Sequence, residues 1–472
     1  MKAAVLFALA AAQAIAPALE AAGWPSFRGE NASGVGGGHI PAALAREAAR
    51  WRTPLPPGTS SPVLAGDRIY VTGAEGDQLL TLALDGKTGR ILWRRSIERG
   101  RAETLHKLNS PASPTPATDG RDVYVFFGDY GLASYGPDGE ERWRMPLGPF
   151  ENLHGMAASP VLSGGRLFVA IDQDTASYLL ALDKGTGKVL WKTPRPAVVH
   201  GFSTPLIYTS PKGDEQVVVP GSYLLTAYSA ATGEERWSAR GLSWQIKTTG
   251  IVDGGAIYVT GWAPGADPGQ NRPLPPFEQV LAEIDADKDG KLAPGEINPS
   301  PYKHSGSWRA IDLNADEFID AREFGFYRAR RSARNATLAV RPGDARGDIT
   351  ATHVLWTNDR FVPQVSSPLL YKGVLYTIKD GGILTSIDPA TGAIHKTARI
   401  PGAIDAYYSS PVAAGERILV ASEHGKVSTI KPGAQWEAEA VTDFEEDIYA
   451  TPAIGPKTLY LRSAAALYAF GE

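Results

Sequence analysis

The sequence has no cysteine in its 472 residues. That absence excludes disulfide bonds, thiolate metal sites, c-type haem attachment and a lipid-modified N-terminal cysteine. The chain also lacks a strong excess of either charge, and its net charge of −4 gives no indication of a nucleic acid or an anionic surface as a partner. The one basic run, residues 328–334, is interpreted as a solvated helix face.

Long hydrophobic runs are missing everywhere except at the N-terminus. Residues 1–22 combine Lys2, an apolar stretch and small residues, with Ala12-Gln13-Ala14 as one candidate cleavage position. This pattern predicts a signal peptide. A membrane anchor is the rival interpretation, but the run is short and is broken by Gln13 and Pro17. We expect a periplasmic or secreted protein, a monomer, with no transmembrane segment.

What the chain does contain is a repeat of about 45 residues. One unit begins at Ser60 with SSPVLAGDRIYVTG and continues with LLTLALDGKTGRILW. It matches a unit that begins at Ala158 with ASPVLSGGRLFVAI and continues with YLLALDKGTGKVLW. Each unit reads as strand, turn, strand, loop, alternating strand, Thr-Gly turn and a strand with Trp. Four strands per unit at this period predict the blades of a β-propeller.

The units can be aligned on the residue that opens their first strand. The anchors are Pro62, Pro114, Pro160, Pro205, Gly250, Pro368, Pro411 and Pro452. One gap, from Gly250 to Pro368, is far longer than the others, and removing about 70 residues, 265–334, restores the period. The sequence therefore predicts an all-β, eight-bladed propeller with an insertion in its fifth unit.

The two chain ends indicate how the ring closes. The eighth unit stops after its third strand, and an additional strand around Trp51 precedes the first unit. If this N-terminal strand completes the last blade, no sheet edge stays exposed. A Trp recurs in the outer strand, and this series is predicted to pack between blades. Its members are Trp51, Trp93, Trp143, Trp191, Trp237, Trp356 and Trp436, with Lys396 at the aligned position of the sixth unit.

These repeats resemble a known family. KTGRILW, GTGKVLW and ATGEERW, each following an SPV(L)-type strand, are similar to the pyrroloquinoline quinone (PQQ)-type propeller repeat of quinoprotein dehydrogenases and of the outer-membrane β-barrel assembly lipoprotein. The opening WPSFRGENASGVG, residues 24–36, is similar to the start of secreted bacterial members. The resemblance covers residues 24–264 and 335–472. It implies the fold far more than an activity.

The insertion contains a calcium-loop pattern, DADKDGKLAPGE, at residues 285–296. Carboxylates at positions 1, 3, 5 and 12 and a backbone carbonyl at position 7 can surround Ca²⁺ with oxygen, while Gly290 permits the sharp turn. The predicted ligands are Asp285, Asp287, Asp289, Lys291 (carbonyl) and Glu296. Phe277, Val280, Leu281 and Ile284 recur at helical spacing and predict a short amphipathic helix before the loop.

A second loop, DLNADEFIDARE, follows at residues 312–323. Its predicted ligands are Asp312, Asn314, Asp316, Phe318 (carbonyl), Asp320 and Glu323. The sixth position is Glu317 where the family pattern has Gly, which costs about 1–2 kcal/mol if the backbone is left-handed there, so a weaker second site is expected. The resemblance to paired loops implies a β-bridge between Leu292 and Ile319. Pro299 and Pro301 shorten the helix after the first loop, which favours a structural rather than a switching role.

Polar and aromatic residues recur just before the anchors, in loops that enter the innermost strands. They are His106, His154, His200, Gln245, Lys247, Gln364, Tyr407, Tyr408 and Tyr449. These loops share one face of a propeller, so the side chains are expected to surround one mouth of the central channel and to bind a ligand or partner. Capping and inter-blade bonding are the alternative role. The insertion connects a second strand to a third and should rise from the same face.

Catalysis is not expected from these residues. In the family that the repeat resembles, the enzymes place a vicinal disulfide under PQQ and hold calcium at the central site, whereas this chain has no cysteine and its calcium patterns lie in the insertion. PQQ is therefore not an expected cofactor. No nucleophile elbow, zinc spacing or phosphate loop is present in the sequence.

The sequence thus predicts a signal peptide (1–22), a propeller in two parts (23–264 and 336–472) and an EF-hand pair between them (265–335). We interpret the protein as a non-catalytic binding or scaffold protein of the bacterial envelope that binds Ca²⁺. Its partner would be an envelope protein or a glycan. A divergent quinoprotein dehydrogenase or a hydrolase using the mouth residues is the first alternative, and a glycan-binding module is the second.

Overall fold

The structure, a computed structural model, describes residues 23–471. Within them the strands form eight sheets, and eight blades arranged around a central channel make a β-propeller, as predicted. The predicted signal peptide lies outside the described residues. No helix in the described part is long and apolar enough to cross a membrane.

Seven blades are built from four strands that follow one another from the channel outward. Blade 1 contains β2 (Val63–Ala65), β3 (Arg68–Glu75), β4 (Gln78–Asp85) and β5 (Ile91–Glu98). Blade 2 contains β6 (Ala117–Thr118), β7 (Val123–Phe127), β8 (Gly131–Tyr135) and β9 (Glu141–Pro146). Blade 3 contains β10 (Val161–Ser163), β11 (Arg166–Ile171), β12 (Tyr178–Asp183) and β13 (Val189–Pro194). Blade 4 contains β14 (Leu206–Thr209), β15 (Glu215–Pro220), β16 (Leu224–Ser229) and β17 (Glu235–Arg240), to which β21 (Gly347–Asp348) adds in parallel.

The remaining blades complete the circle. Blade 5 contains β18 (Ile251–Asp253), β19 (Ala256–Gly261), β20 (Ala336–Val340) and β22 (Val354–Asn358). Blade 6 contains β23 (Leu369–Tyr371), β24 (Val374–Lys379), β25 (Ile383–Ile387) and β26 (Ile394–Arg399). Blade 7 contains β27 (Val412–Ala414), β28 (Arg417–Ala421), β29 (Lys426–Lys431) and β30 (Glu437–Asp443). Blade 8 combines β31 (Ala453–Ile454), β32 (Thr458–Arg462) and β33 (Ala466–Gly471) with β1 (Trp51–Pro54).

The ring closes as the sequence predicts. β1 pairs with β33 in antiparallel register, with Trp51 opposite Ala469, so one blade contains both ends of the described chain. Buried aliphatic and aromatic residues between neighbouring sheets form the core.

A closed ring of hydrogen bonds surrounds the channel. In each blade, the backbone N–H of the Ser or Thr before the first strand donates to the hydroxyl of the equivalent residue in the next blade, over 3.0–3.2 Å. The members are Ser61, Thr115, Ser159, Thr204, Thr249, Ser367, Ser410 and Thr451, all buried. Thr115 precedes Pro116, so Pro116 is the true anchor of the second unit; the choice of Pro114 from the sequence is wrong by two residues.

The Trp series packs between blades. The indole N–H of Trp93 donates 2.7 Å to the Pro137 carbonyl of the next blade, and the ring covers Gly139, where a Cβ would lie 2.8 Å from it. Trp51, Trp143, Trp191 and Trp356 repeat this contact on the next blade's turn. Trp237 differs because β21 covers it, and its indole donates to Gln216.

The assignment of Trp436 to this series is wrong. The strand register places Ala440 of β30 at the Trp position, and Trp436 precedes that strand. Trp436 instead contacts blade 6, where Lys396 occupies the Trp position. The ammonium of Lys396 lies 4.5 Å from the centre of the Trp436 ring and donates to the Trp436 carbonyl.

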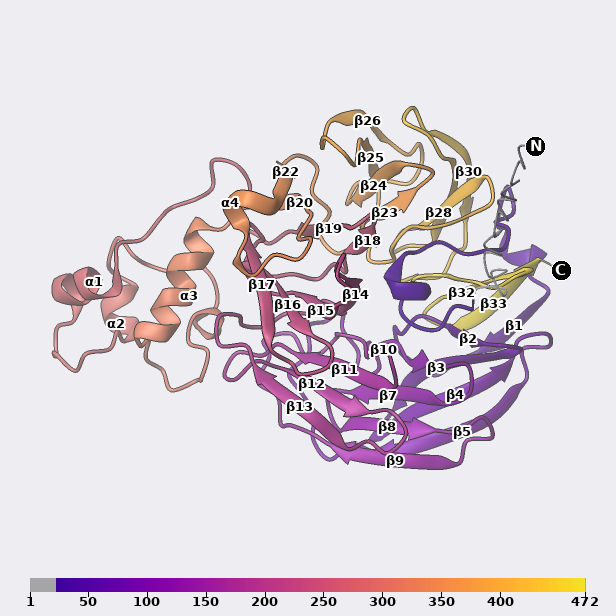
Figure 1. The fold of residues 1–472 in the computed structure, drawn as a ribbon, viewed down its shortest axis with the longest axis horizontal. Helices are drawn as coiled ribbons and strands as arrows, with labels where there is room; N and C mark the ends of the chain where they lie inside the picture. Colours follow the sequence, from indigo (N-terminus) through magenta and orange to yellow (C-terminus); the bar gives the residue numbers. More distant parts are fainter. Residues whose placement is uncertain (1–22, 472) are drawn as a thin grey trace, which may run out of the picture.

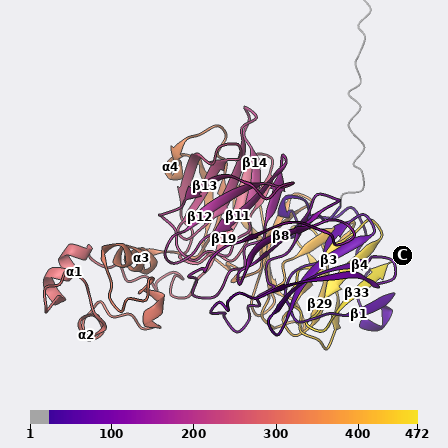
Figure 2. The ribbon, with the colours of Figure 1, turned by 90° about the horizontal axis from the view of Figure 1, so that it is seen from below.

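The insertion forms a separate helical lobe beside the blades (Figures 1 and 2). It contains α1 (Phe277–Ile284), as predicted, followed by α2 (Pro294–Ile297), the 3₁₀ turn η3 (Trp308–Ala310) and α3 (Ala321–Ser332). Val280, Ile297 and Phe324 are among the residues of its own small core. Elsewhere the described helices are short: η1 (Glu30–Ala32), η2 (Arg46–Ala48) and α4 (Thr350–His353).

We predict that Thr249→Val destabilises the fold, because the valine removes the acceptor of the buried Thr204 N–H without changing side-chain shape. An unsatisfied buried donor costs about 1–3 kcal/mol. Thr249→Ser keeps the hydroxyl and serves as the matched control, with a loss of at most about 1 kcal/mol for the missing methyl. Urea denaturation measures both, and equal losses in the two variants would refute a role of the hydroxyl ring in stability.

Candidate functional site

The loops that enter the innermost strands surround a cavity of about 510 Å³ at one mouth of the channel. Predicted residues that line it are His106, His154, Gln245, Lys247, Gln364, Tyr408 and Tyr449. Trp262 and Pro264 also line it, so the insertion begins at this face, where the strand order places it. Six hydroxyl residues of the ring form part of the lining: Ser61, Thr115, Ser159, Thr204, Thr249 and Thr451.

Residues 24–36 cross the channel beneath this cavity, and Phe27 contributes to its lining. The carbonyls of Trp24 and Pro25 accept from blades 1 and 2, and the side chain of Asn31 exchanges two hydrogen bonds with Ile207 of blade 4. Arg28 is fully buried and donates 2.6 Å to the Pro368 carbonyl of blade 6. The cavity therefore has a protein floor, which the sequence pattern of this segment did not reveal.

Two predicted mouth residues do not line the cavity. His200 is 2% exposed; its Nδ1 bonds to the carboxylate of Asp174 and its ring meets Trp244 edge-on at 5.8 Å, which holds it beneath the insertion. Tyr407 is 1% exposed, and its hydroxyl donates 2.9 Å to the Ala403 carbonyl instead of facing the channel. The predictions that His200 and Tyr407 face the channel are therefore wrong.

Two of the predicted histidines, His106 and His154, do line the cavity. The rings of His106 and His154 meet edge-on at 5.3 Å. Burial, reinforced by the neighbouring charges of His200, His106 and Lys247, lowers the pKa of His154 to about 4. His154 is consequently uncharged at neutral pH and can accept or donate a hydrogen bond, but it contributes no charge.

The polar side chains of the cavity differ in how many hydrogen-bond partners they have. Burial lowers the pKa of Lys247 to about 8, and its ammonium has a carbonyl, that of Trp262, at 3.4 Å. Gln245 is 3% exposed, and its Nε2 has no partner among the described residues. Asp380, by contrast, accepts from the Tyr407 N–H and, with the amide suitably oriented, from Gln364.

Asp380 and Trp262 were missed by the sequence reasoning. Both follow the second strand of a blade, Asp380 after β24 and Trp262 after β19. The connection between second and third strands lies on the same face as the entry to the first strand. Strand order, which puts the insertion at the mouth, therefore also puts both residues there.

The loop that carries His106 is fastened by a buried carboxyl group. Glu103 accepts 3.1 Å from the Met156 N–H, and its own N–H donates 2.7 Å to Asp129. Asp129 forms an ion pair of 2.7 Å with Arg99. Burial, with a smaller contribution from the charge of Asp129, raises the pKa of Glu103 to about 7.

The two acidic loops of the insertion share one backbone conformation. Positions 4 and 6 are left-handed in both: Lys288 and Gly290 have φ of 61° and 82°, and Ala315 and Glu317 have φ of 60° and 71°. In both, the Glu at position 12 accepts from the N–H of position 2. Leu292 and Ile319 form the expected antiparallel bridge, with N–H to carbonyl distances of 3.1 and 2.9 Å.

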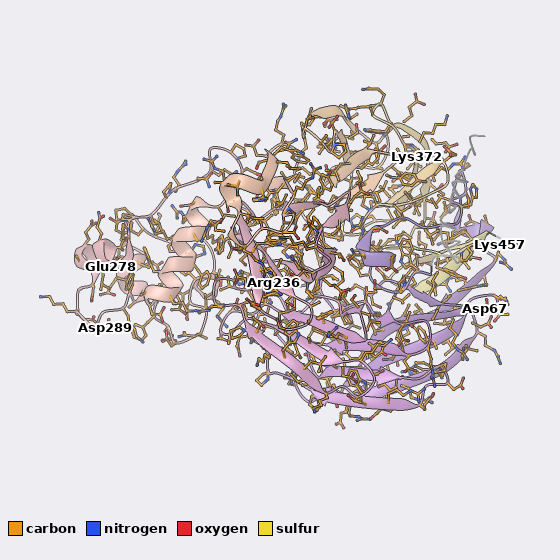
Figure 3. The ribbon with its side chains drawn as sticks, viewed as in Figure 1. Asp67, Arg236, Glu278, Asp289, Lys372 and Lys457 are labelled. Atoms are coloured by element: carbon orange, nitrogen blue, oxygen red, sulfur yellow. The ribbon has the colours of Figure 1, made fainter. Side chains whose placement is uncertain are left out.

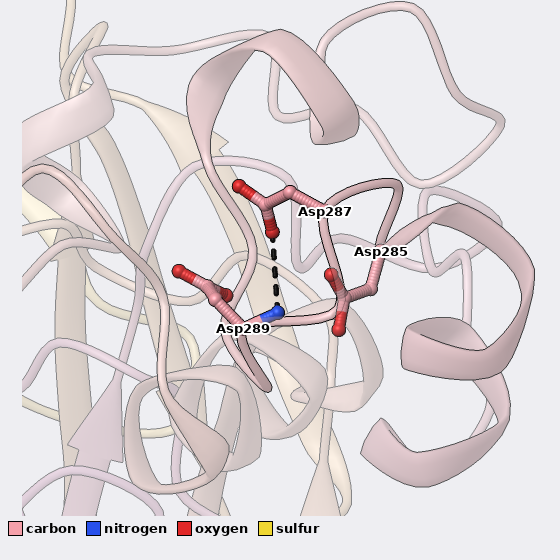
Figure 4. A group of neighbouring side chains, drawn as sticks. All are labelled: Asp285, Asp287 and Asp289. Carbon is pink, nitrogen blue, oxygen red and sulfur yellow. Dashed lines mark hydrogen bonds between the residues drawn. The ribbon is translucent and has the colours of Figure 1, made fainter.

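Carboxylates converge within each loop. Oxygens of Asp285, Asp287 and Asp289 lie within 4.8 Å of one another, and Figure 4 shows the three side chains around the turn. The second group, Asp312, Asp316 and Glu323, meets the same limit and is more buried, with Oδ1 of Asp312 unpartnered among the described residues. Of the other predicted ligands, Asn314 and Asp320 turn toward their own loop and Asp320 caps α3. Lys291 and Phe318, at position 7 of each loop, each donate a backbone N–H to the position-5 carboxylate.

α3 docks the insertion on the propeller. Arg322 donates 3.0 Å to the Asp174 carbonyl, and the guanidinium of Arg330 lies 3.7 Å from the centre of the Trp244 ring. Arg309 pairs with Glu151 at 3.2 Å. The interpretation of residues 328–334 as a solvated face is therefore wrong at Arg330, whose pKa is lowered by burial. The second loop leads directly into α3 and so lies next to the propeller. Asp289 and Glu278 are at the far end of the lobe (Figure 3).

Comparison with known proteins agrees with this fold. A profile of the PQQ_2 family, described as outer membrane protein assembly factor BamB, matches residues 22–176, 128–259 and 175–292, together more than half of the chain. The overlap of the matches is what a repeated unit produces.

Curated relatives include enzymes and assembly factors. A polyvinylalcohol dehydrogenase of Pseudomonas sp is 30% identical over 147 residues, 28% of this chain and 22% of that protein. BamB of Alkalilimnicola ehrlichii is 32% identical over 140 residues, 29% of this chain and 33% of that protein. BamB of Burkholderia pseudomallei is 30% identical over 179 residues, 38% of this chain and 41% of that protein. The chain thus spans well under half the length of these relatives.

Solved structures share the architecture. BamB from Moraxella catarrhalis aligns with a TM-score of 0.54 at 13% identity, covering 89% of this chain and 98% of that chain. A europium-containing methanol dehydrogenase aligns with a TM-score of 0.60 at 10% identity, covering 95% and 91%. At such low sequence identities, the similarity to these structures shows a shared fold alone.

The partly buried Glu103 predicts a pH dependence of stability. Its pKa is about 7 in the folded protein against an ordinary 4.5, so the folded state binds the proton more tightly than the unfolded state. Its contribution is full below about pH 4.5 and is lost as pH rises to about 7, by roughly 2–3 kcal/mol. Glu103→Gln should remove this loss, since the amide oxygen still accepts from Met156. The difference in unfolding free energy between wild type and variant at pH 5 and pH 8 measures it. The exposed Glu98→Gln is the control, and a difference that is the same at both pH values would contradict the assignment.

Proposed function

The chain belongs to the PQQ_2 family of outer membrane protein assembly factor BamB, and on that premise we propose that it is a calcium-binding, non-catalytic binding protein of the bacterial envelope. The observation that carries the calcium part is the pair of equivalent loops joined by the Leu292–Ile319 bridge. The proposal of a binding function is supported by the cavity at the mouth, which residues 24–36 close from below. Some of its buried polar groups have no hydrogen-bond partner among the described residues.

The residues of both loops fit Ca²⁺. Hard oxygen ligands at loop positions 1, 3, 5 and 12 suit this ion, and the left-handed backbone at position 6 is the turn that an EF-hand loop needs. In the first loop the carboxylates of Asp285, Asp287, Asp289 and Glu296 would hold it, with the Lys291 carbonyl. Bound calcium would supply positive charge that neutralises these clustered carboxylates. The lobe, which has only a small apolar core, would thereby be stabilised.

The second loop is expected to bind less tightly. Its ligands would be Asp312, Asn314, Asp316, Glu323 and the Phe318 carbonyl, with Asp320 at the position that water usually bridges. Glu317 adopts φ of 71°, and a non-glycine residue pays about 1–2 kcal/mol for such a conformation. Oδ1 of the buried Asp312 has no partner among the described residues, and carboxylate oxygens of Asp312, Asp316 and Glu323 lie within 4.8 Å of one another, which supports a second site.

The mouth does not fit the quinoprotein alternative. The described lining contains one carboxylate, Asp380, and it is already engaged by Tyr407 and Gln364. The chain has no cysteine for the disulfide that the quinoprotein resemblance implies under PQQ. Within the described residues the clusters of three or more close metal-ligating groups are both in the insertion. We therefore favour binding without catalysis, as for an assembly factor, over the dehydrogenase activity named for other relatives.

The location of the lobe supports a role in shaping the mouth. The insertion starts at Trp262 in the cavity wall, and Asn335 ties its two ends together by bonding to Ala263 and Asp267. α3 then rests on the loops of blades 3 to 5 through Arg322 and Arg330. A rigid lobe would form one wall beside the cavity, and calcium would supply part of that rigidity.

We predict that calcium raises the melting temperature of the insertion. A ligand present at a hundred times its Kd and bound to the folded state alone adds about 2.7 kcal/mol. Glu296→Gln should remove most of this gain and Glu323→Gln a smaller part. Glu278→Gln, an exposed acid on α1 outside both loops, is the matched control and should behave as wild type. Calorimetry with calcium and with a chelator tests this, and superimposable curves for the wild type would refute the calcium sites.

A second experiment tests the coupling to the mouth. Calcium should slow hydrogen exchange in residues 277–327 and also in residues 172–176 and 243–247, which touch α3. Arg330→Ala removes the contact with Trp244 and should leave the protection within the lobe while reducing it in residues 243–247. If the wild-type response is confined to the lobe, the insertion is an independent appendage and does not shape the mouth.

A further inference from the structure

The mouth cavity contains hydrogen-bond donors that the protein leaves without acceptors. Gln245 is 97% buried, yet its Nε2 has no partner among the described residues, and the side chain lines the cavity. A buried amide donor without an acceptor costs about 1–3 kcal/mol, so such a group indicates a bound molecule that supplies one. Lys247 lines the same wall, forms no ion pair among the described residues and has the Trp262 carbonyl at 3.4 Å.

The hydroxyl ring adds further donors. Each hydroxyl accepts a backbone N–H from the preceding blade, which occupies one lone pair and leaves its own proton to be donated elsewhere. For the six ring residues that line the cavity, no acceptor of that proton occurs among the described residues; they are Ser61, Thr115, Ser159, Thr204, Thr249 and Thr451. A ligand rich in oxygen acceptors would satisfy these groups.

The walls offer flat aromatic surfaces. Tyr408 and Tyr449 are stacked, with ring centres 6.0 Å apart and planes 26° from parallel, and both line the cavity. Trp262 lines it as well. Tyrosine and tryptophan combine an apolar face with a polar tip, so they suit a ligand that has an apolar ring face and hydroxyl groups at its edge.

Charge and size narrow the choice of ligand. The lining contains one lysine, Lys247, and one carboxylate, Asp380, which is already engaged, and of its two histidines His154 is neutral. One carboxylate on the ligand would pair with Lys247, whereas a polyanion would find too few cations. A neutral sugar would leave Lys247 unpaired, and an aromatic acid without hydroxyls would leave the ring donors unpaired. A volume of about 510 Å³ admits one or two sugar rings.

We propose that the mouth cavity binds an acidic saccharide, a hexuronic acid unit, with its carboxylate on Lys247 and Gln245 and its ring against Tyr408 and Tyr449. The sugar hydroxyls accept from the hydroxyl ring and donate to the carboxylate of Asp380, whose two oxygens offer more lone pairs than its present partners use. This inference rests on the proposed binding function and names its ligand class.

Calorimetric titration of the calcium-loaded full chain tests the proposal. The probes are glucuronate and galacturonate, with glucose and galactose as neutral counterparts and acetate as the bare carboxylate. At least one uronate should bind more than tenfold tighter than both its neutral counterpart and acetate. Equal affinity for the sugar and its uronate would overturn the role of the carboxylate. Uronate and acetate of equal affinity would overturn the saccharide.

Three variants locate the site. Lys247→Met keeps the length and apolar stem of the side chain and should weaken uronate binding at least tenfold while leaving glucose unaffected. Tyr408→Ala should weaken both sugars, since it removes the ring surface and not the charge. Lys372→Met removes a lysine on the outer surface, which pairs with Glu416, and should bind as wild type. Unchanged affinity in both cavity variants would overturn the proposed site.

The pH dependence provides a test on the unmodified protein. The pKa of Lys247 is about 8, so uronate affinity should decline as pH rises above 8, with no such decline in Lys247→Met. The other titratable groups facing the cavity are Asp380, His106, His154, Tyr408 and Tyr449. Affinity that stays constant from pH 7 to 9 would contradict the ion pair. Absence of uronate binding would overturn this inference alone, because the calcium-dependent melting and exchange experiments decide the proposed function independently.

Discussion

The structure depends on a cyclic hydrogen-bonded ring around the channel. Eight blades converge on an axis where backbone N–H groups cannot reach a neighbouring strand or bulk water. A Ser or Thr hydroxyl from the next blade satisfies each of them, from Ser61 through Thr451 and back to Ser61. Every blade is donor to one neighbour and acceptor from the other, so a missing blade would leave buried groups unpaired on both sides. This constraint links ring closure to the polar lining of the mouth, since the same hydroxyls do both.

At the outer rim, neighbouring blades are held together by the packing of Trp rings on the adjacent turns and not by a ring of hydroxyl groups. Where Trp93 packs on the neighbouring turn, Gly139 has φ of 80° and leaves room for the indole. The exceptions are also explained by the neighbours: β21 covers Trp237, and Lys396 lies over Trp436 where the series lacks a member. The rim thus accommodates different residues at the Trp position, whereas at the axis each hydroxyl accepts from the backbone N–H of the preceding blade.

The cavity at the mouth is shaped by two segments outside the repeated blades, the N-terminal segment 24–36 and the insertion. The propeller provides an axis with one covered end, because residues 24–36 cross it and Arg28 donates to the Pro368 carbonyl. The helical lobe begins at Trp262 in the cavity wall and returns to the neighbouring loops through α3. The cavity wall combines the ammonium of Lys247, which has no ion-pair partner among the described residues, with hydroxyls and aromatic rings. Such an environment is suited to binding a polar molecule.

The sequence by itself determined the number of blades and the closure by the strand at Trp51, because the repeat period and the incomplete eighth unit can be read directly from the residues. The resemblance to paired calcium loops implied the bridge between Leu292 and Ile319. The sequence also assigned most mouth positions, since strand order dictates which loops share a face. Only the tertiary structure decided that His200 turns away toward Asp174 and that Asp380 joins the mouth. It alone revealed the hydroxyl ring and the floor at Phe27. The physical reason is that side-chain direction and pairing across blades depend on partners far away in the chain, which no local pattern encodes.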